Sequence, residues 1–144
     1  MGEFGARLAL GGQWQRGAAL LDRALAQNPG GGGYYHGSRA LAAYMLQQND
    51  TALTEIRQAD LGKFPLFHLV AAVIYAQNGM MDEAKREGEA FVRMRPAFIP
   101  NIEAELKKRN IPAQDRARMI AGVRKAGLLS PDATSNISPS AGNF

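Results

Sequence analysis

Residues 11–29 (GGQWQRGAALLDRALAQNP), 46–64 (LQQNDTALTEIRQADLGKF) and 76–96 (AQNGMMDEAKREGEAFVRMRP) repeat one pattern along the chain. Equivalent positions are spaced by 35 residues and then by 32. The equivalent sets are Trp14, Asn49 and Met81; Gly17, Ala52 and Ala84; Ala24, Ala59 and Phe91; and Pro29, Phe64 and Pro96. A repeat of this length with helical periodicity predicts stacked helical hairpins.

The small residue early in each of these segments explains how the two helices of a hairpin would pack. Gly17, Ala52 and Ala84 hold this position, and their lack of bulk allows the second helix to approach the first closely. A single hairpin leaves one apolar side uncovered, so the units are expected to stack on one another.

We therefore predict an all-α protein. The expected helices lie near residues 3–11, 15–27, 34–46, 50–60, 66–78, 82–94, 99–109 and 113–126. Gly79 marks the turn inside the third unit, while Gln47 and Gln48 replace that glycine in the second. Asp50 and Asp82 stand where helix N-caps are expected, and Gly127 predicts the end of the last helix.

The repeat resembles the tetratricopeptide (TPR) repeat, whose period is about 34 residues. Residues 34–128 also resemble the C-terminal repeat region of large bacterial signalling proteins. In those proteins such repeats follow a class III adenylate or guanylate cyclase domain or a winged-helix DNA-binding domain, often with a TolB-like segment between. The most specific matches are RMRPAFIPNIEAELKKRNI (93–111) and AGVRKAGL (121–128).

This resemblance implies a TPR-type solenoid of about three repeats closed by a C-terminal helical pair. The domain would cover residues 1–128, with units at about 1–29, 34–64 and 66–96 and terminal helices at 99–127. Residues 129–144 are polar and contain two prolines, which predicts a flexible tail. Met1 to Phe4 look like a cloning junction, and the first repeat is cut short there, so we expect a piece of a longer protein.

No catalytic, cofactor or metal site is expected from the sequence. The chain has no cysteine, which excludes thiolate catalysis and zinc sites built on cysteine. Four of the five serines lie in the predicted tail. His36 and His68 open two equivalent helices, and helix-entry histidines that pack or cap are a simpler interpretation than a pair of metal ligands.

The expected function is therefore protein binding by a scaffold, with a groove lined by the first helix of each unit. The groove residues predicted from TPR geometry are apolar or aromatic: Leu10, Tyr34, Leu41, Tyr44, Met45, Leu66, Leu69 and Val73, with Ala6 beside them. Such a wall favours an amphipathic helix, a neighbouring domain of the parent protein or a second copy of the chain. The alternative is that the superhelix closes and these residues bury against one another.

Charge offers a second functional hypothesis. The net charge is +4, and basic residues concentrate in the last third of the chain. The alternative hypothesis is that this part docks on nucleic acid or an anionic membrane. We expect neither partner, because no aromatic residues are interleaved there to stack on bases. The chain carries no recognisable export signal, from which a cytoplasmic location is expected.

Overall fold

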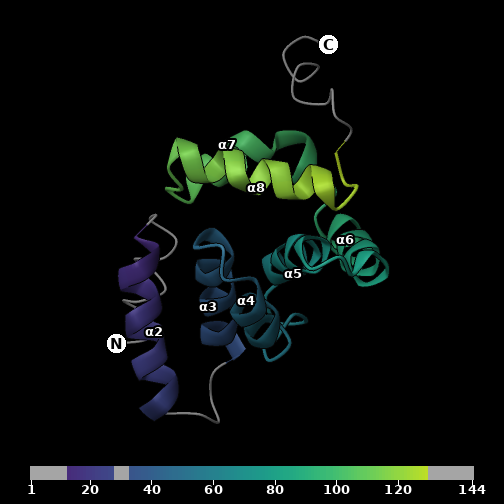
Figure 1. Ribbon diagram of the computed structural model, residues 1–144. Coiled ribbons are helices and arrows are strands. Elements are labelled where there is room, and N and C mark those ends of the chain that lie inside the picture. Colours follow the sequence, from purple (N-terminus) through teal and green to yellow (C-terminus); the bar gives the residue numbers. More distant parts are fainter. Residues whose placement is uncertain (1–12, 28–32, 130–144) are drawn as a thin grey trace.

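A computed structural model describes residues 13–27 and 33–129. These residues form seven α-helices, one short 3-10 helix and no strand (Figure 1). The elements are α2 (Trp14–Gln27), α3 (Gly33–Met45), α4 (Asn49–Ile56), α5 (Leu66–Gln77), α6 (Met81–Met94), η1 (Ile99–Asn101), α7 (Ile102–Lys108) and α8 (Ala113–Lys125). The prediction of an all-α protein is confirmed for this part of the chain.

The helices pack mainly against their neighbours in sequence. α3 and α4 form one hairpin, α5 and α6 form another, and α2 lies along α3. α5 contacts both α4 and α3, so the first helix of the second hairpin packs against both helices of the first. Ala52 in α4 and Ala84 in α6 are almost completely buried, at 1% and 0% exposure, which agrees with their predicted role as small packing residues.

The two hairpins share backbone and side-chain features at a constant separation of 32 residues. Gln47 and Gly79 both have a positive φ, of 62° and 77°. Both turns also close in the same way, because the N–H groups of Gln48 and Met80 donate to the fifth residue before them at 2.8 Å. This is the hydrogen bond of a Schellman motif, whose left-handed position favours glycine.

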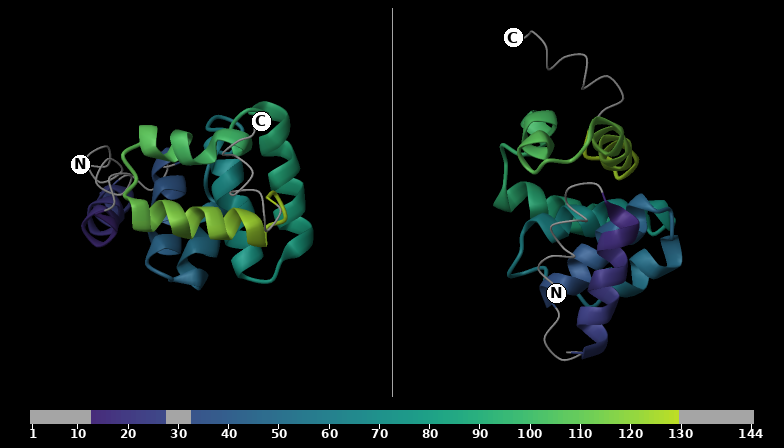
Figure 2. Two further views of the ribbon diagram at one scale, coloured as in Figure 1. Left: turned by 90° about the horizontal axis from the view of Figure 1, so that it is seen from above. Right: turned by 90° about the vertical axis from the view of Figure 1, so that its left-hand side faces the viewer.

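The C-terminal helices form a second layer across the ends of the hairpins, as both views in Figure 2 show. α8 packs on α5. The Trp14 indole N–H donates to Asp115 Oδ2 at 2.9 Å, so α8 also contacts the start of α2. The Tyr44 hydroxyl donates to the Arg118 carbonyl oxygen at 3.4 Å, which places the end of α3 under the same helix.

Gly122 allows this close approach of α8. A Cβ atom at Gly122 would overlap the Tyr44 hydroxyl and lie 3.2 Å from Val73 Cβ. The buried core then continues from α3 and α5 into α7 and α8, because Ile102, Leu106 and Val123 belong to the same cluster as Val73.

Several local expectations can be compared with the observed helix ends. Gly127 ends α8 with a φ of 84°, as predicted. The N-cap predictions are wrong, because α4 and α6 are capped at Gln48 and Met80. Asp50 and Asp82 lie instead inside the first turn, where a carboxylate is still favourable to the helix dipole. α4 also ends at Ile56 instead of near residue 60.

Two predictions fall outside the described residues: the helix at 3–11 and all but the first residue of the predicted tail at 129–144. Within the described part, no helix has both the length and the apolar character needed to cross a membrane.

Candidate functional site: an apolar and a polar pocket

The predicted groove residues do not form one continuous exposed wall. Leu69 and Val73 lie in the core at 0% and 1% exposure, and Tyr44 and Met45 are each 6% exposed. α8 covers Val73 and the Tyr44 hydroxyl. Leu10 and Ala6 lie outside the described residues. The remaining predicted residues, Tyr34, Leu41 and Leu66, come together in one pocket.

We call this hollow the apolar pocket. Its volume is about 220 Å³, and it lies between α3 and the segment that enters α5. Its floor consists of the buried residues Leu41, Phe67 and Val70 together with one buried polar residue, Ser38. Four partly exposed residues surround the opening: Tyr34, Phe64, Pro65 and Leu66.

Three aromatic rings give the apolar pocket its shape. The ring centroids of Tyr34 and Phe64 are 5.1 Å apart, and those of Phe64 and Phe67 are 5.5 Å apart. These separations lie in the range of favourable tilted aromatic contacts. Gly37 is needed beside them, because a Cβ atom there would overlap the Phe67 ring. Arg95, which is exposed, is the charged residue of the lining.

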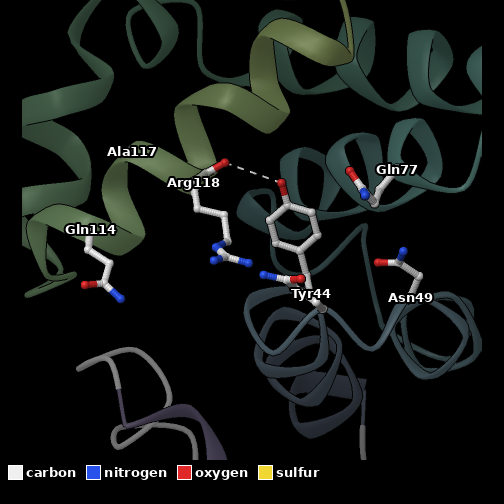
Figure 3. A pocket seen from close by; sticks show the side chains of 7 residues that line it. Tyr44, Asn49, Gln77, Gln114, Ala117 and Arg118 are labelled. Carbon is white, nitrogen blue, oxygen red and sulfur yellow. Dashed lines mark hydrogen bonds between the residues drawn. The ribbon is translucent and has the colours of Figure 1, made fainter.

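A second hollow, the polar pocket, lies where the α3–α4 turn and the end of α5 face α8 (Figure 3). Its volume is about 600 Å³. The lining includes four carboxamides, one guanidinium and one phenol: Gln47, Asn49, Gln77, Gln114, Arg118 and Tyr44. Burial raises the pKa of Tyr44, while the Arg118 charge acts in the opposite direction.

In this pocket the side chains of Gln47 and Arg118 are in direct contact. With the Gln47 carboxamide oxygen turned toward the guanidinium, it accepts hydrogen bonds from Arg118 Nη1 and Nη2 at 2.6 and 3.1 Å. The repeat alignment pointed to position 47 only as a missing turn glycine. Nothing in the local sequence indicated that Arg118, which lies in α8, would contact Gln47, which follows α3.

The two histidines make the same contact in both hairpins. His36 Nδ1 lies 2.7 Å from Glu55 Oε1, and His68 Nδ1 lies 2.6 Å from Glu87 Oε1. Each pair joins the first helix of a hairpin to the second, so these histidines have a packing role within the unit. Among the described residues, no group of three or more His, Cys, Asp or Glu side chains is placed to hold a metal ion.

Several of the basic residues in the last third have acidic partners. Arg109 Nη1 lies 3.0 Å from Glu105 Oε1, and Arg116 Nε lies 3.0 Å from Glu103 Oε2. The Arg109 hydrogen bond holds the pKa of Glu105 below its usual value. These pairs place carboxylates among the cations and interrupt the basic surface suggested by the sequence.

Comparisons of the chain with protein-family models, with curated proteins and with solved structures found no match.

Proposed function

We propose that this chain is a non-catalytic protein-interaction module of the TPR type, from the C-terminal region of a bacterial signalling or regulatory protein. The repeated hairpins support the repeat assignment. The turn residues, the buried alanines and the histidine–glutamate pairs all recur 32 residues apart. The bacterial signalling context rests on the sequence resemblance of residues 34–128 alone.

The observation that carries the proposal is the apolar pocket. Monomeric proteins normally cover large apolar side chains, and a hollow lined by them is a usual place for a partner to bind. Here Tyr34, Phe64 and Leu66 remain partly exposed around a floor that is apolar except for Ser38. The pocket has room for one large apolar side chain.

The positive charge of Arg95, in the lining of the apolar pocket, favours one class of partner. Arg95 is exposed and lines the apolar pocket, so an acidic residue beside the anchoring side chain would pair with it. We therefore propose an amphipathic helix, from a partner protein or from a neighbouring domain of the parent protein, as the occupant. It would present one large apolar residue with an Asp or Glu within one helical turn.

A displayed library of amphipathic helical peptides, selected on the immobilised chain, tests this proposal. Enriched peptides should share an apolar anchor and a nearby acidic residue. Leu66→Asp should weaken their binding by about tenfold or more, because a charge would enter a surface that must lose its water. Leu66 is the first residue of α5, where a carboxylate is compatible with the helix.

Met81→Asp is the matched control, because Met81 is an exposed apolar residue, at 47% exposure, and is the first residue of α6 as Leu66 is the first residue of α5. It should leave peptide binding unchanged. Equal binding to Leu66→Asp and the parent chain would refute the apolar pocket as the site. If peptides are instead enriched only for acidic charge and release steeply with salt, binding is electrostatic and does not use the apolar pocket.

A further inference from the structure

The polar pocket has the size of a small-molecule site, and its lining is polar. Its volume of about 600 Å³ lies within the range of roughly 300–1,000 Å³ that is usual for ligand pockets. In Figure 3, Arg118 lies between Gln114 on one side and Tyr44 on the other, with Asn49 and Gln77 beyond Tyr44. The hydrogen-bonding groups therefore lie on both sides of Arg118 along the pocket.

The charge of Arg118 is not neutralised by an acidic side chain among the described residues. None of the described residues that line the polar pocket is acidic, and the ion pairs of the described chain do not include Arg118. Its contact is the neutral Gln47 carboxamide oxygen, at 2.6 and 3.1 Å from Nη1 and Nη2. A guanidinium has five N–H donors, so donors remain for an anion.

The backbone at Gln47 indicates that this contact has a function beyond closing the turn. Gln47 has a φ of 62°, whereas Gly79 holds the equivalent turn in the next hairpin. A side chain in the left-handed region costs about 1–2 kcal/mol. Non-glycine residues held in such regions often cluster at functional sites. Of the two described non-glycine residues with positive φ, Gln47 and Asn110, Gln47 is the one whose side chain contacts the Arg118 guanidinium.

The residues that line the polar pocket favour one class of anion over others. A single guanidinium balances one negative charge, which suits a carboxylate, whereas a phosphate monoester carries close to two at neutral pH. The lining has no acidic group to hold an ammonium, which disfavours a free amino acid. The carboxamides of Asn49 and Gln114 offer both donors and acceptors to hydroxyl groups. Lys125 Nζ lies 3.4 Å from Gln77 Oε1, so the Gln77 amide contributes its NH₂ donors.

We propose that the polar pocket binds a small organic monocarboxylate that carries hydroxyl groups, in the class of the sugar acids. The carboxylate would accept hydrogen bonds from Arg118, and the hydroxyl groups would contact the surrounding carboxamides. This site is separate from the apolar pocket and does not depend on the proposed protein partner.

Titration of the ¹⁵N-labelled full chain with sodium gluconate, followed by ¹H–¹⁵N NMR, tests the proposal. The side-chain amide signals of Gln47, Asn49, Gln77 and Gln114 should shift and saturate at millimolar gluconate. Acetate, which has the carboxylate without the hydroxyl groups, should bind more weakly at the same signals. Glucose should leave them unchanged, because it lacks the charge.

Arg118→Met removes the charge and keeps most of the aliphatic stem, and we expect it to weaken gluconate binding by about tenfold or more. Lys107→Met is the matched control, because Lys107 is exposed on α7. It removes the same charge outside the pocket and should leave the affinity unchanged. The backbone spectra of both variants show directly whether the fold is retained.

Three outcomes would overturn the proposal. If neither gluconate nor acetate shifts the four amide signals at millimolar concentration, the pocket is not an anion site. Tighter binding of glucose 6-phosphate than of gluconate would show that the charge argument is wrong. If Lys107→Met and Arg118→Met weaken gluconate binding equally, the affinity depends on the net charge of the chain and not on the pocket.

Discussion

Gln47 occupies a backbone position where the equivalent residue of the next hairpin is a glycine, Gly79. Gln47→Gly should therefore stabilise the protein by about 1 kcal/mol, because glycine adopts positive φ without the steric cost of a Cβ atom. Its exposed contact with Arg118 offsets only part of that gain. Urea unfolding followed by far-UV circular dichroism measures the change.

The reciprocal substitution provides the control. Gly79→Gln places a side chain at a φ of 77° with no other atom within 4 Å of its Cβ, so the backbone conformation alone is tested. It should destabilise by about 1–2 kcal/mol. If Gln47→Gly is destabilising while Gly79→Gln behaves as expected, the Gln47–Arg118 contact contributes more than the turn strain costs.

Tyr44 gives the fold a dependence on alkaline pH. Burial raises the pKa of its hydroxyl in the folded protein, an effect larger than the opposing charge of Arg118. The stabilisation by the neutral phenol is therefore fully present below about pH 10, where an unfolded tyrosine keeps its proton. It is lost as the pH rises through the folded-state pKa.

Tyr44→Phe removes this titration while keeping the ring. The free energy of unfolding of the parent chain should fall relative to that of Tyr44→Phe as the pH increases above about 10. Chemical denaturation of both proteins at neutral and alkaline pH measures the difference. A constant difference over that range would show that the hydroxyl titrates in the folded state as it does in water.

At the scale of helices, Gly122 determines how closely α8 approaches α3 and α5. In an exposed helix, Gly→Ala stabilises by about 1 kcal/mol. At Gly122 the new Cβ would overlap the Tyr44 hydroxyl and lie 3.2 Å from Val73 Cβ, so we expect Gly122→Ala to destabilise by about 1–3 kcal/mol instead.

A double-mutant cycle identifies the cause of that loss. If the Tyr44 hydroxyl is the main obstacle, Tyr44→Phe in the Gly122→Ala background should recover part of the stability, and the two substitutions should not be additive. Thermal or urea unfolding of the four proteins gives the coupling free energy. A Gly122→Ala variant more stable than the parent would contradict the packing of α8 described here.

Helix positions could be predicted from the sequence because they depend on local information. Apolar periodicity, the turn glycine Gly79 and the terminal Gly127 placed most helix ends within one or two residues. The start of α7, predicted at residue 99, lies at Ile102 after η1, and α4 is the larger exception. Its predicted end near residue 60 was too late, because the segment after Ile56 forms turns before α5 begins at Leu66.

The pockets could be predicted only in part, because they depend on contacts between residues distant in sequence. TPR geometry identified Tyr34, Leu41 and Leu66 correctly as neighbours, since they lie on adjacent first helices. The repeat pattern contains no information about where the last two helices dock. Because α8 docks there, it covers Val73 and brings Arg118 into contact with Gln47. Neither contact was predicted from the sequence.

At the scale of the whole molecule, the C-terminal layer connects parts that a linear repeat array keeps apart. In such arrays each repeat contacts only its neighbours, so stability is a sum of local terms. Here α8 packs on α5, and its Asp115 accepts a hydrogen bond from Trp14 in α2. α8 therefore contacts both α2 and α5. These contacts favour unfolding of the described helices as a single unit.

The single tryptophan of the chain allows this cooperativity to be measured. Trp14 fluorescence reports on the contact between α2 and α8, and far-UV circular dichroism reports on all helices. In urea the two transitions of the parent chain should coincide, as expected for two-state unfolding.

Asp115→Ala removes the acceptor 2.9 Å from the indole nitrogen, so the fluorescence transition should move to lower urea than the dichroism transition. Glu89→Ala, which removes an exposed carboxylate from α6, should keep the two transitions together. Transitions that already separate in the parent chain would mean that α2 unfolds independently and that the layer of α7 and α8 does not couple the two ends of the array.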